Sequence, residues 1–102
     1  MNHTVTLTVP MALEASTMVI EHVQQSFTLL HGGCSSWPVI GHYRMNSGEI
    51  VKEMNMRISS FIPKGSFNLG ALFDLARSVA IRLNQESVLL EIDGEAHFIK
   101  GR

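Results

Sequence analysis

Two hydrophobic periods alternate along this chain, and their order restricts the fold more than any other feature. Apolar residues recur at every second position in residues 4–10, 50–62 and 87–92, which is typical of strands with one buried face. Lys52 interrupts the second of these patterns and predicts a local bulge or an exposed strand start. They recur at three- and four-residue spacing in residues 11–31 and 69–83, which is typical of amphipathic helices. Residues 35–45 carry aromatic and β-branched side chains and precede a turn at 46–48, so they predict the first strand of a hairpin.

Turn-forming residues mark the ends of these predicted elements. Pro10 ends the first strand, Gly32 ends the first helix, and Ser66 or Asn68 can cap the second. Asp93–Gly94 is a two-residue hairpin signal, after which residues 95–100 can fold back as a short edge strand. The order β-α-β-β-α-β, with a possible fifth strand, predicts a ferredoxin-like α+β sandwich with both helices on one face of an antiparallel sheet. We expect a single domain over residues 1–102.

Composition excludes several classes of protein. Eight basic and nine acidic side chains give a formal charge of −1, with no basic run to attract nucleic acid or an anionic membrane. One cysteine, Cys34, rules out an intramolecular disulfide and favours a reducing compartment. The first ten residues have neither a positive leader nor an apolar segment, and no run reaches the ~20 apolar residues that cross a bilayer. We therefore expect a cytoplasmic protein.

Two stretches of the chain resemble a known group of proteins. "GHYRMNSGEIVKE" and "LARSVAIRLNQESVLLEIDGEAHFI" are similar to a family of small uncharacterised bacterial and phage-associated proteins. The matching positions are Gly41, Tyr43, Gly48, Glu53, Gln85, Ser87 and Val88. The resemblance implies the same architecture and a phage or mobile-element setting, and it carries no established activity.

One candidate surface is the outer face of the predicted sheet. Trp37 and Tyr43 share a register and, with Leu89 and the threonines of the first strand, would form a partly apolar face. Such a patch commonly marks association, although Trp37 can equally cover an open edge of the core. Our main interpretation is a non-enzymatic interaction or regulatory protein that forms a homodimer through this face or through a strand edge.

The alternative is a small-molecule-binding protein or enzyme. Glu53 and Glu91 are expected on adjacent strands of the same outer face, with Arg57 close by, and His42 would complete a pocket beside the hairpin. A carboxylate of raised pKa in such a pocket can do acid–base chemistry. On an exposed sheet face, however, a Glu–Arg pair is an ordinary cross-strand contact.

The sequence gives less support to a zinc site, a cysteine nucleophile or an RNA-binding surface. His31, Cys34 and His42 are the only residues with the chemistry of zinc ligands near one another in sequence, and their spacing is not that of a zinc site. Cys34 follows a helix C-terminus, where the helix dipole disfavours a thiolate nucleophile. RNA-recognition domains of this fold need outward aromatics where this chain has threonines, and metallochaperones need a second cysteine. We expect no cofactor and no metal.

Overall fold

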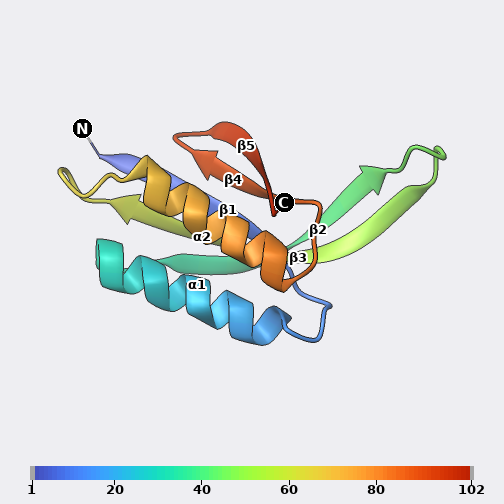
Figure 1. Cartoon of the computed structure of the whole chain (residues 1–102), viewed down its shortest axis with the longest axis horizontal. Helices are drawn as coiled ribbons and strands as arrows, with labels where there is room; N and C mark the ends of the chain where they lie inside the picture. Colours follow the sequence, from blue (N-terminus) through green and yellow to red (C-terminus); the bar gives the residue numbers. More distant parts are fainter. Residues whose placement is uncertain (1, 102) are drawn as a thin grey trace.

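The computed structural model describes residues 2–101, which form two helices and five strands in the predicted order. The elements are β1 (His3–Pro10), α1 (Ser16–His31), β2 (Ser35–Arg44), β3 (Ile50–Ile62), α2 (Leu69–Arg82), β4 (Ser87–Ile92) and β5 (Glu95–Lys100). The strands form one sheet in the order β2-β3-β1-β4-β5, with every neighbouring pair antiparallel. Both helices lie on the same face of this sheet (Figure 1). The predicted ferredoxin-like α+β sandwich is confirmed, and β5 extends it at one edge.

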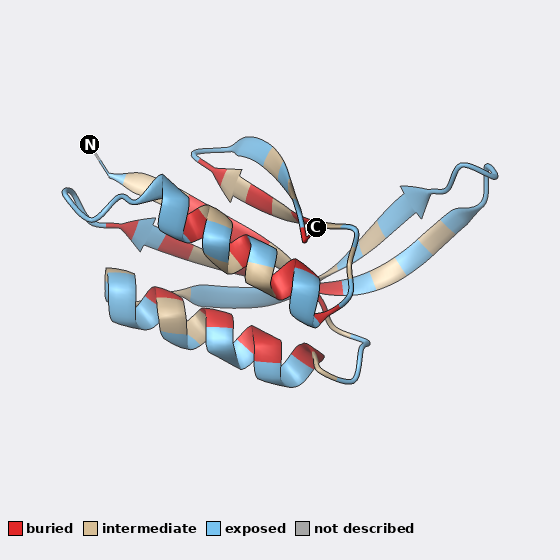
Figure 2. Ribbon diagram, in the orientation of Figure 1, coloured by how far each residue is buried: buried red, intermediate tan, exposed pale blue. Residues whose placement is uncertain are grey.

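The core lies between the helices and the inner face of the sheet. Val5, Leu7 and Val9 alternate along the central strand β1 and are fully buried, as the period of two predicts. The two helices contribute the other side of the core, and in Figure 2 their buried residues lie along one side of each helix. The main helical contributors are Val19, Ile20, Val23, Phe27, Leu72, Ala76, Val79, Ala80 and Leu83.

The ends of both helices follow from local chemistry. Gly32 adopts a φ of 93° and donates its N–H to the carbonyl of Thr28, which is the predicted left-handed cap of α1. The side chain of Asn68 accepts a hydrogen bond from the N–H of Ala71 and caps α2. The expected start of α1 at Met11 is wrong by five residues, because the chain needs residues 11–15 to cross from the sheet to the helical layer before Ser16.

The β2–β3 hairpin projects beyond the helices (Figure 1). The molecule is therefore elongated, with principal extents of 45 × 26 × 25 Å. Ile50 and Met54 were expected on the buried face of their strand, yet they are 66% and 40% exposed because no helix covers this end of the hairpin. Lys52 pairs in regular register with His42 and is exposed near the start of β3, so the exposed strand start forms and the bulge does not.

The last hairpin attaches to the start of the chain. Asp93 and Gly94 have φ values of 53° and 82°, which suit the tight turn between β4 and β5. The Asp93 carboxylate accepts a hydrogen bond from the N–H of Thr4 at 2.9 Å and contacts Nδ1 of His3 at 2.6 Å. Between residues 2 and 101, neither helix has the length and apolar character needed to cross a membrane.

Candidate functional site

The outer face of the sheet carries six of the candidate binding residues predicted from the sequence, while His42 lies on the opposite face. Residues that are paired across an antiparallel ladder share a face, and alternate residues of one strand share it too. The register therefore places six side chains on the face opposite the helices. They are Trp37, Tyr43, Glu53, Arg57, Leu89 and Glu91.

Arg57 and Glu91 form an ion pair in the middle of this face. Nη1 of Arg57 lies 2.7 Å from Oε1 of Glu91, and both side chains are about three-quarters buried, at 27% and 23% exposure. The guanidinium also lies 5.9 Å from the centre of the Trp37 ring. The expectation that Glu53 and Glu91 occupy adjacent strands is wrong, because β1 lies between β3 and β4.

A cavity of about 290 Å³ lies on one side of this ion pair, and we call it the Tyr43 cavity. It forms where the projecting hairpin leaves the sheet, so that all five strands contribute residues to it. Its volume is close to the ~300 Å³ lower end for small-molecule sites. The cavity is lined by Thr8, Pro10, Tyr43, Glu53, Asn55, Gln85, Ser87, Val88, Leu89 and Phe98.

Tyr43 is held in this cavity by two neighbours. Its ring lies over Gly41, where an added Cβ would stand 2.7 Å from the phenol oxygen. Nδ2 of Asn55, a residue only 2% exposed, donates a hydrogen bond to the same oxygen at 3.2 Å. Because the phenol accepts from Asn55, its own proton stays available for a ligand.

The cavity also holds a carboxylate and an unsatisfied hydroxyl. Glu53 is the one acidic side chain among the described residues that line it. Within residues 2–101, the buried Oγ1 of Thr8 has no hydrogen-bond partner, which is uncommon for a buried polar atom. Leu89 and Phe98 supply apolar surface on the other side. The arrangement suits a ligand with one cationic or polar end and one flat apolar part.

Tyr43, Glu53 and Leu89 were predicted as site residues, and Thr8 was predicted on the same face with the other threonines of the first strand. Asn55 and Phe98 were not predicted. Asparagine is depleted in strands, so its presence in the middle of β3 was an available signal. His42 was expected beside Glu53, but it pairs with Lys52, one position along the ladder, and so lies on the opposite face of the sheet. Arg57 and Glu91 do not line the Tyr43 cavity and pair with each other instead.

The three residues considered for zinc do not converge. His31 contacts Ser60, Cys34 lies against the carbonyl of Gln24, and His42 is on the hairpin. In the part of the chain that the structure describes, no three His, Cys, Asp or Glu side chains form a group that could hold a metal ion.

Comparison with known proteins finds similarity in structure alone. No protein-family model matches the sequence, and no curated protein matches it significantly. A phage SAM lyase in complex with S-methyl-5′-thioadenosine has a TM-score of 0.68 at 20% identity, over 97% of this chain and 89% of that one. The apo state of a phage SAM lyase has a TM-score of 0.64 at 20% identity, over 96% and 88%.

A third solved structure shares the fold within a longer chain. It is a Bacillus cereus protein related to NIF3, with a TM-score of 0.60 at 13% identity, over 97% of this chain and 27% of that chain. At these identities the likeness concerns the fold, and it extends over nearly all of the present chain in each comparison.

Proposed function

We propose that this protein binds S-adenosylmethionine (SAM) in the Tyr43 cavity and releases S-methyl-5′-thioadenosine from it, in a phage or mobile-element setting. The observation that carries the proposal is the meeting of Tyr43, Glu53 and Asn55 beside an apolar wall. The fold likeness to a phage lyase bound to S-methyl-5′-thioadenosine, over 97% of the chain, supports the choice of ligand.

The chemistry of the ligand fits the cavity. SAM carries a positive charge on sulfur, which a carboxylate and the face of an aromatic ring both stabilise. Glu53 and the ring of Tyr43 supply these two groups. The neutral thioadenosine part would lie toward Leu89 and Phe98, and the hydroxyl of Thr8 would gain the partner that it lacks.

The reaction requires cleavage of the bond between sulfur and the amino-acid chain of SAM. The bonding electrons pass to sulfur, which becomes a neutral thioether. As the sulfur leaves, either the substrate's own carboxylate attacks the same carbon and closes a lactone, or a base takes a proton from the neighbouring carbon and an alkene forms. In the first route Glu53 holds the sulfonium in place, and in the second it is also the nearest available base.

A direct assay tests this function. The purified protein is incubated with SAM, and S-methyl-5′-thioadenosine and its lactone or alkene co-product are measured by chromatography. We expect Glu53→Gln and Tyr43→Leu to reduce the rate by at least tenfold, since the first removes the carboxylate and the second the aromatic ring that contact the sulfonium. Glu49→Gln, an exposed change in the hairpin turn, is the matched control and should keep full activity.

Binding is measured separately from turnover. At a concentration 100 times its Kd, S-methyl-5′-thioadenosine should raise the melting temperature by roughly 10 °C. The absence of both a product and a thermal shift would reject the proposed function. A shift without product would leave the site as a binding site and remove the lyase step.

We also propose that the chain self-associates, since apolar side chains are exposed along the projecting hairpin. Trp37, Ile40, Tyr43, Met45 and Ile50 are 41–66% exposed. The register places Ile40 and Ile50 on one face of the hairpin and Trp37 and Tyr43 on the other, so a second copy packed on the Ile40 and Ile50 face would leave the Tyr43 cavity open. Sedimentation should give about twice the 11.3 kDa chain mass, and Ile40→Ser and Ile50→Ser should each lower it. A monomer in the parent protein would contradict this proposal and leave the ligand proposal untouched.

A further inference from the structure

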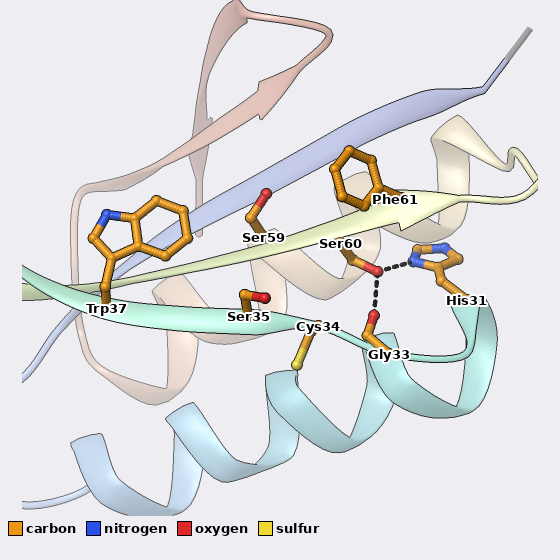
Figure 3. Close-up of a pocket in the computed structure, with 8 residues that line it drawn as sticks. All are labelled: His31, Gly33, Cys34, Ser35, Trp37, Ser59, Ser60 and Phe61. Atoms are coloured by element: carbon orange, nitrogen blue, oxygen red, sulfur yellow. Dashed lines mark hydrogen bonds between the residues drawn. The ribbon is translucent and has the colours of Figure 1, made fainter.

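A second cavity wraps around the edge of the sheet where β2 begins, with Ser35 and Ser59 on the outer face and His31 on the helix side, and we call it the His31 cavity. It has a volume of about 500 Å³ and forms where β2 begins, beside the C-terminal end of α1 (Figure 3). The Arg57–Glu91 ion pair lies between it and the Tyr43 cavity. It is lined by His31, Gly33, Cys34, Ser35, Trp37, Ser59, Ser60 and Phe61.

Two aromatic side chains bound the cavity, and two serines form its floor. Ser35 pairs with Ser59, and Trp37 pairs with Arg57 two positions along the ladder, so the serines and Trp37 share the outer face. Phe61 follows Ser59 by two residues and points to the same face, where it is 77% exposed. Trp37 is paired with Arg57, and Phe61 lies four residues after Arg57 on β3, so the two aromatic residues are ~13 Å apart along the strand. This leaves room for a flat bicyclic ring above the small serine side chains.

His31 has its tautomer set by its neighbour. The hydroxyl of Ser60, which is 2% exposed, donates its only proton to the carbonyl of Gly33 at 2.7 Å. Its oxygen can therefore only accept from Nδ1 of His31, which lies 3.1 Å away (Figure 3). Nδ1 carries the hydrogen, and the neutral ring is left with Nε2 as a bare acceptor. Partial burial lowers the pKa of His31 and so favours this neutral form.

The remaining polar groups of the cavity are hydrogen-bond donors without charge. Oγ of Ser59 accepts from the hydroxyl of Thr6 at 3.0 Å, so the proton of Ser59 stays free to donate. No Asp, Glu, Lys or Arg occurs among the described residues that line the cavity. Cys34 directs its sulfur away, toward the carbonyl of Gln24 on α1. The site therefore offers a fixed acceptor, a nearby donor and aromatic walls to an uncharged ligand.

We propose that the His31 cavity binds an uncharged adenine-type ring, as a free base or a nucleoside. Nε2 of His31 accepts from the exocyclic amino group, and a serine hydroxyl donates to a ring nitrogen. The ring lies over Ser35 and Ser59, in contact with Trp37 and Phe61. The inference is independent of the proposed function, because it uses neither Tyr43 nor Glu53.

Trp37 is the single tryptophan of the chain, so its fluorescence reports directly on this cavity. We would titrate the protein with adenine, adenosine and N6,N6-dimethyladenine, which has no amino proton to donate. Adenine should quench the fluorescence, and the dimethyl compound should bind about tenfold more weakly. Whichever of adenine and adenosine binds more tightly identifies the free base or the nucleoside as the ligand form.

Three phenylalanine variants locate the ligand. Phe61→Leu should weaken adenine binding about tenfold, because base stacking on an aromatic ring is lost. Phe67→Leu is the matched control, since Phe67 is a 38% exposed ring that lines neither cavity, and Phe98→Leu is the comparison that reports on the Tyr43 cavity. All three rings are exposed, so the variants should keep the parent melting temperature. Absence of quenching, equal affinity for the dimethyl compound, or loss of binding in Phe98→Leu alone would overturn the proposal.

Discussion

The phenol ring of Tyr43 lies over Gly41, two residues earlier on the same strand. A Cβ at Gly41 would stand 2.7 Å from the phenol oxygen and 2.9 Å from Cζ, closer than side-chain atoms approach one another. The absence of a side chain at residue 41 thus allows the ring to reach Asn55, and it makes Gly41 a positioning residue for the Tyr43 cavity.

Gly41→Ala should therefore displace Tyr43 and weaken binding of S-methyl-5′-thioadenosine at least tenfold, while the protein still folds. The displacement is expected because the new methyl group would also lie 3.0 Å from Nδ2 of Asn55. Calorimetric titration measures the affinity. Gly70→Ala is the control, since it meets only ordinary contacts in α2 and should raise helix stability by ~0.5–1 kcal/mol. Unchanged affinity in Gly41→Ala would show that Tyr43 does not need this position.

The Arg57–Glu91 ion pair should couple β3 to β4 across the central strand. A double-mutant cycle with Arg57→Gln and Glu91→Gln is expected to give a coupling free energy of ~1 kcal/mol, the upper end for pairs that keep some solvent contact. Urea unfolding at low salt and at 1 M salt measures it. The coupling should shrink at high salt, because the exposed part of the interaction is screened. A coupling of zero at low salt would mean that the contact contributes nothing to stability.

Asp93 should contribute stability that disappears in acid. The hydrogen bond from His3, followed by that from the N–H of Thr4, lowers the pKa of the Asp93 carboxyl below its usual 3.8. The contribution is therefore complete above pH 3.8 and is lost as the pH falls through the lower, folded value.

Asp93→Asn keeps a residue that tolerates the positive φ of the turn but removes the charge. We expect this variant to be less stable than the parent at pH 7, with the difference narrowing below pH 3.8. Urea unfolding at a series of pH values measures the narrowing. If the stability difference between Asp93→Asn and the parent stays constant over the whole pH series, the contribution of the Asp93 charge is contradicted.

His31 should make the folded protein less stable in mild acid. Because burial lowers its pKa from 6.5, the unfolded chain takes up a proton more readily than the folded one. Stability should be unaffected above pH 6.5 and should fall as the pH drops below it. Comparison of the parent with His31→Gln at pH 8 and pH 5.5 isolates this effect. A loss of stability between the two pH values that is equally large in both proteins would assign the effect to other groups.

The sequence by itself determined the architecture, because each element has its own period and its own end signal. Val5, Leu7 and Val9 alternate, α1 stops at Gly32, and Asp93–Gly94 turns the last strand back. These signals act over a few residues, so they are readable without knowledge of the rest of the chain. They also placed Trp37, Tyr43 and Leu89 on one outer face.

Only the tertiary structure decided which polar residues meet. The placement of β1 between β3 and β4 separated Glu53 from Glu91 and paired Glu91 with Arg57 instead. The hydrogen bond between Asn55 and Tyr43, like the contact between His31 and Ser60, joins residues brought together by strand register and by helix packing. Such long-range contacts depend on the relative placement of whole elements. No local pattern of residues encodes that placement.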